Sequence, residues 1–248
     1  YSWVTSISLE QSFIFNNSAP NEGGGVAFQN SSIVSIEDTI FEANSAEFGG
    51  GADIATITTC TIRDTQFRGN TAQTNGAGCW LSAGSYTMTN CLFEDNFSEG
   101  FGGGMTCAVD AFLSVTETNF RRNSCFNGGA GANVISDCFA SFINSPWTSN
   151  RAQVGNGGGA LVEQGFATFS DSGFEGNEGV WGGGAFVEQS TATFQNVSFV
   201  QNTGTELGGG LCARNGTTTT FNSAFLSNTS PIGGAIFFGV ESNGTVTS

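Results

Sequence analysis

The sequence contains no lysine and no histidine, and its six arginines face 21 acidic residues, which gives a formal net charge of -15. This balance argues against a nucleic-acid partner, because little in the chain could neutralise a run of phosphates. The lack of histidine also removes the commonest general base and the commonest metal ligand. Serine–histidine and cysteine–histidine catalysis are thereby excluded, whereas chemistry that uses carboxylates stays open.

Proline and long apolar runs are also scarce. No stretch of 18 residues is apolar throughout, so the sequence predicts no transmembrane segment. The 37 glycines among 248 residues disfavour helices, and apolar residues do not recur with a period of 3.6. Because phenylalanine is abundant and only 11% of the residues are charged, the composition predicts a folded all-β protein with a buried core.

A motif of an aromatic residue, two variable residues and asparagine recurs nine times at steps of 25 to 28 residues, a period typical of solenoid proteins. Its aromatic positions are Phe13, Phe41, Phe67, Phe93, Phe120, Trp147, Phe174, Phe199 and Phe225. Its asparagines are Asn16, Asn44, Asn70, Asn96, Asn123, Asn150, Asn177, Asn202 and Asn228. A cluster of glycines follows each motif, and an Asp, Glu or Asn stands three residues before each aromatic.

Each repeat predicts three short strands: one before the acidic or Asn position, one around the aromatic, and one after the glycines. About 26 residues per circuit fit one turn of a three-sided parallel β-helix. We therefore predict a right-handed, three-sided parallel β-helix of about nine coils that forms a single domain over residues 1–248. Neighbouring strands lie about 4.8 Å apart, so nine coils would make a rod roughly 43 Å long.

Stacked coils would bring equivalent residues of successive repeats into contact. We expect the aromatic residues to form an internal ladder, in which each buried ring contributes about 2 kcal/mol from its area. The asparagines should form a second ladder at a turn, because Asn tolerates left-handed backbone and its amide can bond to the Asn above and below. The two columns are thus assigned a structural role.

Charged residues support this register, because opposite charges fall next to one another in adjacent coils. The expected neighbours are Glu42 with Arg68, Arg68 with Glu94, Glu94 with Arg121, Asp95 with Arg122, and Arg151 with Glu178. Each exposed pair would add only about 0 to 1 kcal/mol, so the pairs indicate register and not stability.

The paired motifs Phe-x-x-Asn and Gly-Gly-Ala-[Ile/Leu/Val] resemble the repeat of the polymorphic outer-membrane proteins of chlamydiae. The second half is complete at residues 158–161 and 233–236, whereas most other repeats read Gly-Gly-Gly. The resemblance covers essentially the whole chain. It implies a parallel β-helix displayed outside the cell as an adhesive or structural element, and it supplies no ligand.

Two acidic residues of the column before the aromatics, Asp38 and Asp64, would lie side by side in this register. Such a pair could bind calcium or act as an acid and a base. The plainer interpretation is that both cap turns, as the Asn residues of this column would, and no other cofactor is expected. A polysaccharide-cleaving β-helix enzyme that uses carboxylates is the alternative function, although here the acids are spread over all coils.

Seven cysteines leave at least one without a partner in the chain. Cys79 and Cys107 would lie roughly 8 Å apart, beyond the usual reach of a disulfide. We therefore expect mostly buried free thiols, and a bridge between Cys125 and Cys138 stays open.

Three glycosylation sequons, at Asn30, Asn215 and Asn243, lie in predicted loops and are the expected acceptors if the source glycosylates. Threonine runs at 56–61 and 217–220 suggest an ice-binding face. In the predicted register, however, these runs do not form one aligned column, which argues against that function.

Neither end of the sequence shows a cap, which is consistent with a piece of a longer repeat protein or with a subunit that stacks end to end. The leading hypothesis is a non-enzymatic extracellular or cell-surface rod with a structural or adhesive role. Under this hypothesis the rod could also be the subunit of a filament. Its expected partners are further copies of itself, other surface proteins or glycans.

Overall fold

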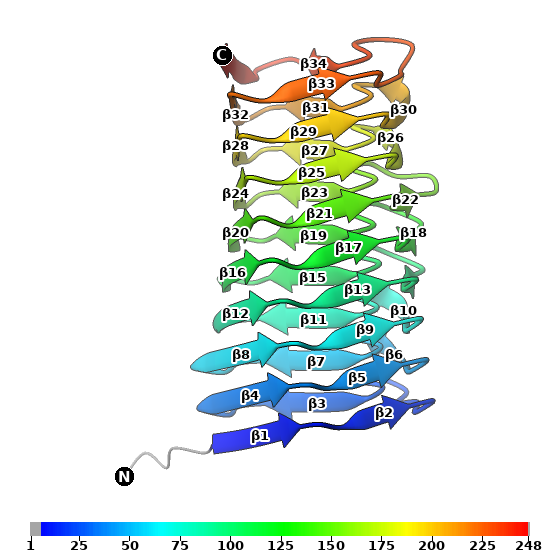
Figure 1. Cartoon of the computed structure of the whole chain (residues 1–248), viewed down its shortest axis with the longest axis vertical. Coiled ribbons are helices and arrows are strands. Elements are labelled where there is room, and N and C mark those ends of the chain that lie inside the picture. Colours follow the sequence, from blue (N-terminus) through cyan, green and yellow to red (C-terminus); the bar gives the residue numbers. More distant parts are fainter. Residues whose placement is uncertain (1–5, 248) are drawn as a thin grey trace.

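The structure is a computed structural model that describes residues 6–247. The strands of this range pair in parallel with their equivalents in adjacent turns and form four sheets, A to D, along one axis (Figure 1). Sheets B and D contain nine strands each, so the solenoid has about nine turns, as predicted.

Sheet A comprises β1 (Ser6–Glu10), β4 (Ile33–Glu37), β8 (Thr59–Arg63), β12 (Ser85–Thr89), β16 (Phe112–Thr116), β20 (Phe139–Ile143), β24 (Phe166–Ser170), β28 (Thr191–Gln195), β32 (Thr217–Phe221) and β35 (Asn243–Thr247). Sheet B comprises β2 (Phe13–Phe15), β5 (Ile40–Glu42), β9 (Gln66–Arg68), β13 (Leu92–Glu94), β17 (Asn119–Arg121), β21 (Pro146–Thr148), β25 (Gly173–Glu175), β29 (Ser198–Val200) and β33 (Ala224–Leu226).

Sheet C comprises β6 (Ser45–Phe48), β10 (Thr71–Asn75), β14 (Phe97–Ser98), β18 (Ser124–Cys125), β22 (Arg151–Ala152), β26 (Glu178–Trp181) and β30 (Thr203–Leu207). Sheet D comprises β3 (Val26–Gln29), β7 (Ala52–Ala55), β11 (Cys79–Ser82), β15 (Met105–Ala108), β19 (Ala132–Ile135), β23 (Ala160–Glu163), β27 (Ala185–Glu188), β31 (Leu211–Arg214) and β34 (Ile236–Phe238).

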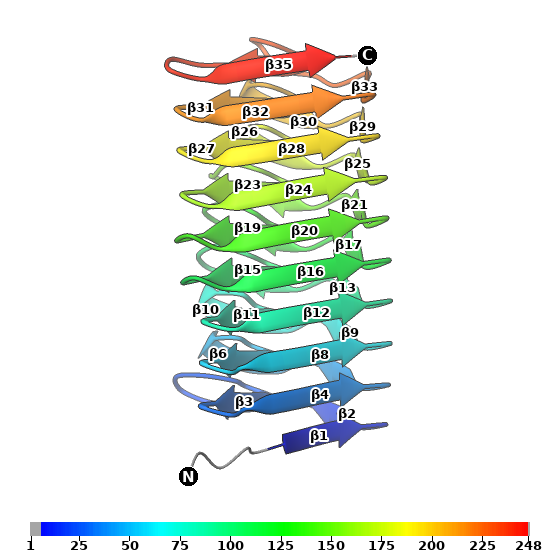
Figure 2. The ribbon, with the colours of Figure 1, turned by 90° about the vertical axis from the view of Figure 1, so that its left-hand side faces the viewer.

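The path of the chain gives the hand of the solenoid. In Figure 1 the chain runs from left to right across the front in β4 and β5, and it returns from right to left behind them in β7, while it climbs from the N-terminus to the C-terminus. The coil is therefore right-handed, as predicted. Figure 2 turns sheet A toward the viewer and shows its strands stacked in chain order from β1 to β35.

Sheet C corrects the prediction of three strands per turn. Its strands follow the ladder asparagines directly and hold two to five residues, as β14 and β10 show. Residues 71–75 alternate only partly between exposed and buried positions, with Ala72 as the fully buried member. The prediction missed this sheet because so short and mixed a segment carries no clear period of two.

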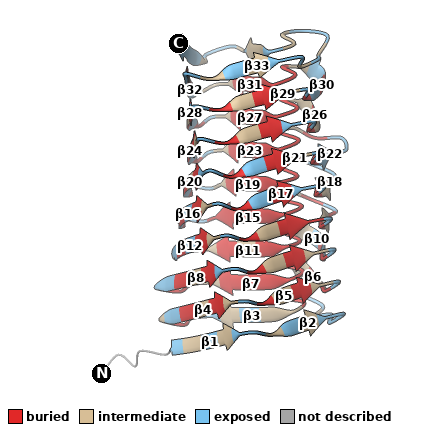
Figure 3. Ribbon diagram, viewed as in Figure 1, coloured by how far each residue is buried: buried red, intermediate tan, exposed pale blue. Residues whose placement is uncertain are grey.

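The interior of the solenoid is one continuous apolar core (Figure 3). Eight aromatic side chains of sheet B, from Phe41 to Phe225, stack in one column with ring centroids 4.1 to 5.3 Å apart. Rings from sheet A meet this column edge-on. The ring centroid of Phe142, for example, lies 5.0 Å from that of Trp147. The column places large apolar rings in contact in both favoured geometries.

The asparagine column closes the turn between sheets B and C. From Asn44 to Asn202, each Nδ2 donates to Oδ1 of the next Asn at 2.9 to 3.1 Å. Each also donates to a carbonyl of the preceding turn, as Asn123 does to Phe93. Each Oδ1 in turn accepts the backbone N–H of the preceding Asn, so these buried amides have partners for every polar atom.

The first turn departs from the predicted register by one residue. Ile14 pairs with Phe41, and Asn17 donates to Asn44, so these residues occupy the ladder positions assigned to Phe13 and Asn16. Phe13 is instead 63% exposed. The sequence there reads Phe-Ile-Phe-Asn-Asn, so the motif matches at Phe13 and Asn16, whereas the structure places the non-aromatic Ile14 and Asn17 in the two ladders. The structural register also places Ile7 beside Val34 and Leu9 beside Ile36.

The ion pairs confirm the register of the central turns. Glu94 contacts Arg68 at 3.7 Å and also contacts Arg121 and Arg122. Arg122 reaches Asp95 at 2.9 Å. Arg151 similarly lies 3.4 Å from Glu178. These neighbours come from adjacent turns, as expected. Glu42 and Arg68 are also neighbours in sheet B, but the described residues include no ion pair between them.

The cysteines differ in one respect from the prediction. Cys107 and Cys138 form a disulfide, with their Cα atoms 6.2 Å apart, so Cys138 does not pair with Cys125. Cys125 lies in a separate small cluster with Ala130 and Ala152. Five cysteines are buried free thiols, in agreement with the prediction.

A buried carboxyl group predicts a pH dependence of folding. Asp53 is only 2% exposed and one of its oxygens has no hydrogen-bond partner. Burial, reinforced by the nearby charge of Glu22, raises its pKa from 3.8 to about 7. Between these two values the folded chain binds more protons than the unfolded chain, so this contribution to stability falls as the pH rises from about 4 to about 7.

Asp53→Asn should therefore remove this part of the pH dependence, because the amide does not titrate. Urea unfolding at pH 4.5 and pH 7.5 measures it, with the exposed Asp110→Asn as the control for loss of one negative charge. Equal loss of stability between the two pH values in the native protein and in Asp53→Asn would contradict this role of Asp53.

Candidate binding face

Sheet A presents alternate residues to the solvent, because side chains alternate across a strand. In β16, Phe112 and Ser114 face outward, whereas Leu113 and Val115 are buried. The parallel pairing of β12, β16, β20, β24 and β28 is unshifted over all five residues of each strand. Outward side chains at equivalent positions therefore form straight rows along the axis.

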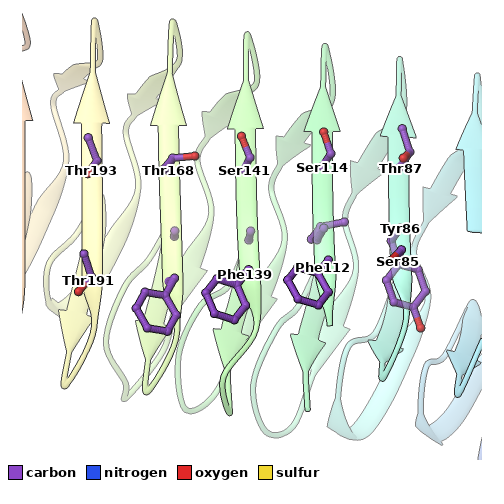
Figure 4. A pocket seen from close by; sticks show the side chains of 14 residues that line it. Ser85, Tyr86, Thr87, Phe112, Ser114, Phe139, Ser141, Thr168, Thr191 and Thr193 are labelled. Carbon is purple, nitrogen blue, oxygen red and sulfur yellow. The ribbon is translucent and has the colours of Figure 1, made fainter. Parts of the chain in front are cut away.

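One row contains three exposed aromatic rings. Phe112, Phe139 and Phe166 begin β16, β20 and β24 and are 57%, 42% and 42% exposed. Their ring centroids are 5.3 Å and 4.5 Å apart, and neighbouring planes differ by 10° and 1°. Figure 4 shows the rings of Phe112 and Phe139 side by side on the sheet surface. The row thus forms an apolar strip of overlapping rings parallel to the axis.

A row of hydroxyl groups runs beside this strip. The third residue of every strand of sheet A is Ser or Thr, and the pairing aligns all of them. Figure 4 shows Thr87, Ser114, Ser141, Thr168 and Thr193 in this row. The row consists of Ser8, Ser35, Thr61, Thr87, Ser114, Ser141, Thr168, Thr193, Thr219 and Thr245.

The alignment of this row shows that the prediction for the threonine runs at 56–61 and 217–220 was wrong, since the two runs do share an aligned column. Thr61 and Thr219, one from each run, both belong to it. Part of this signal was available in the sequence, because from β4 to β28 each Ser or Thr of the row immediately precedes an apolar residue that is buried. Thr219 and Thr245 lack it, since Thr220 is polar and Val246 is exposed. The Phe strip also had a signal, since its members are 27 residues apart.

A shallow groove of about 460 Å³ lies over the rings and hydroxyls of β12 to β28. A second groove of about 330 Å³ adjoins it and shares Phe166 and Thr191 with it. The turn between sheets D and A supplies polar side chains to the second groove, including Gln164 and Gln189. Nε2 of Gln164 donates to Oε1 of Gln189 at 3.0 Å. The two turns that form the rim of the second groove are therefore stacked in the same way as the strands.

The face is free of charge. Seven successive strands of sheet A, from β12 to β35, contain no Asp, Glu, Lys or Arg. Sheet B, by contrast, carries the ion pairs around Glu94. The acidic residues nearest to the rings lie in the turns between sheets D and A, where Asp137 lines the second groove and Asp110 precedes Phe112 by two residues.

The predicted acidic pair does not line either groove. Asp38 and Asp64 occupy the turn between sheets A and B with φ of 48° and 50°, in the left-handed region that Asp and Asn tolerate. Asp64 accepts a hydrogen bond from Asn90 of the next turn at 2.6 Å. Within residues 6–247, no group of three or more Asp, Glu, Cys or His is arranged to hold a metal ion.

The candidate glycosylation sites lie at the edges of sheet A. Asn30 and Asn215 occupy turns between sheets D and A, both with positive φ. Asn243 is exposed but begins β35, so it does not lie in a loop as predicted.

The outward side chains of the face limit the chemistry that it can carry out. From β12 to β28 the outward side chains of the face are hydroxyls, phenyl rings, one amide and the aliphatic Ile143, none of which changes its charge near neutral pH. A hydroxyl becomes a nucleophile when an adjacent base activates it, and the outward positions of β12 to β28 contain no such base. Exposed apolar surface bordered by polar groups is typical of interaction sites.

No protein-family model and no curated protein sequence matches the chain. Among solved structures, the surface protein and adhesin PfbA of Streptococcus pneumoniae aligns over 98% of this chain and 91% of that chain. The identity is 6% and the TM-score 0.24, values too low to support any conclusion about fold or function. The part of the chain that the structure describes has no helix long and apolar enough to cross a membrane.

Proposed function

We propose that this protein is a non-catalytic extracellular rod with a structural and adhesive role at a cell surface, and that it adheres through the outer face of sheet A. The observation that carries the proposal is the strip of exposed Phe rings beside an unbroken row of hydroxyls, on strands without charge. The resemblance of the repeats to those of chlamydial surface proteins supports the location.

A structural role agrees with how the chain uses its repeats. The aromatic and asparagine columns are buried in ladders that hold successive turns together, so most repeated residues serve the fold. Asp38 and Asp64, the acids named for the alternative function, occupy a turn and do not line the two grooves on sheet A, and Asp64 borders a separate pocket of about 300 Å³ with Arg121. End-to-end stacking of chains and contacts with other surface proteins stay predictions.

Two measurements test the proposal. Antibody labelling of intact source cells should detect the protein at the surface. Incubation of purified protein with polysaccharides should release no more reducing ends or unsaturated sugars than a heat-denatured sample. If the protein released such products and Asp38→Asn or Asp64→Asn abolished the release, the carbohydrate-cleaving alternative would be established instead.

A further inference from the structure

The outward side chains of the face repeat from strand to strand, and this regular spacing favours a ligand that is itself a repeating polymer. Each strand from β12 to β28 offers an outward side chain at the same two positions, and neighbouring strands are about 4.8 Å apart. The five strands together span about 19 Å along the axis. A small compact molecule would use one or two of these steps, whereas a linear polymer that lies along the axis uses all of them.

The paired rows select a ligand with both apolar and hydroxyl-bearing surface. The rings of Phe112, Phe139 and Phe166 expose apolar surface that can pack against the C–H groups of a ligand. The adjacent Ser and Thr hydroxyls both donate and accept hydrogen bonds, and so do the amides of Gln164 and Gln189 on the opposite side. Sugar rings offer C–H groups on one surface and hydroxyls around their edge, and they match this arrangement.

The charge of the chain selects a neutral ligand. An anionic polymer would be repelled by a protein of net charge -15, and Asp137 lines the second groove. A cationic polymer would be attracted by the net charge, but on strands β12 to β28 it would meet no carboxylate, and Asp137 is the single acidic residue that lines either groove. The face therefore complements an uncharged polymer.

We propose that the outer face of sheet A binds one uncharged linear polysaccharide whose chain lies along the axis of the rod. This inference rests on the adhesive function proposed above and names its ligand class. The Phe strip supports successive sugar rings, the Ser and Thr row bonds to hydroxyls along one side, and Gln164 and Gln189 bond along the other.

The test is binding of the purified protein to cellulose, chitin and mannan as neutral polymers, with polygalacturonate and alginate as anionic ones. We expect retention on at least one neutral polymer and on neither anionic polymer. For soluble oligomers of the bound polymer, the affinity should rise with length until the chain covers the face. Retention on the anionic polymers alone, or on none of the five, would overturn the inference.

Variants locate the site. The triple change Phe112→Ser, Phe139→Ser and Phe166→Ser should weaken binding by at least about tenfold, a change that reports the loss of the ring contacts. Phe221→Ser is the matched control, because Phe221 is 46% exposed on the same sheet but lies outside both grooves. Binding that survives the triple change in a folded protein would place the site elsewhere.

A second variant tests the proposed site even if the triple variant fails to fold. Gln164→Ala with Gln189→Ala removes only exposed amides at the rim, and we expect it to weaken binding to the same neutral polymer. Equal binding by this variant and the native protein would contradict the two-sided arrangement. Retention in growing ice with no retention on any polymer would assign the hydroxyl row to ice and also overturn the inference.

The two proposals fail separately. Surface labelling without polymer binding would leave the rod at the cell surface and remove only the polysaccharide. Release of sugar products would remove the non-catalytic role, whichever polymer is bound.

Discussion

Asn123→Ala should lower the free energy of unfolding by about 4 kcal/mol, because it leaves several buried polar groups without partners. The side chain donates to Asn150 and to the carbonyl of Phe93, and its oxygen accepts two bonds from Asn96. Alanine would leave the buried backbone N–H of Asn96 and one N–H of its side-chain amide without an acceptor. Equilibrium urea unfolding, followed by far-ultraviolet circular dichroism, measures the change.

The first turn provides the control for this prediction. Asn17 makes the same kind of bond to Asn44, but it is exposed and accepts no bond from a further turn among the described residues. Asn17→Ala should therefore cost only about 1 kcal/mol. Similar losses in the two variants would show that the ladder follows from stacking of the coils and does not hold them together.

Much of this architecture could be predicted because every turn of a solenoid repeats the same local structure. Each turn places Phe and Asn at the same positions, so nine weak signals add up to one register, and the pairing of Arg122 with Asp95 tests it independently. The error in the first turn has the opposite cause. There Phe13 fits the aromatic position of the motif and Ile14 does not, and only the pairing of the first strands with the next turn shows that Ile14 takes the ladder position.

The candidate face was harder to predict, because its residues point outward, whereas the residues that repeat in every turn are buried. Phe112, Phe139 and Phe166 repeat in only three turns, so they are easily taken for scattered surface residues. The disulfide was missed for a related reason. Cys138 lies in a turn outside the strands, where the register of the ladders does not fix its distance to Cys107.

Phe120→Ala should be as damaging as the loss of an Asn, with a cost of about 3 to 5 kcal/mol. Phe120 is fully buried and stacks on Phe93 at 5.1 Å and on Trp147 at 4.1 Å. Alanine would leave a cavity between these two rings, which the sheets cannot close because ladder hydrogen bonds fix the spacing of β13, β17 and β21. Urea unfolding measures the loss.

Phe112 makes the comparison informative, since it begins the strand that precedes β17 and also stacks on a ring of the next turn, at 5.3 Å. It is 57% exposed, however, so Phe112→Ala should change stability by less than about 1 kcal/mol. Two ring stacks with similar spacing would then differ in what they do: the inner one holds the fold, and the outer one remains free to contact a ligand. If Phe112→Ala cost as much as Phe120→Ala, the outer rings would belong to the fold, and the binding face would lose its main support.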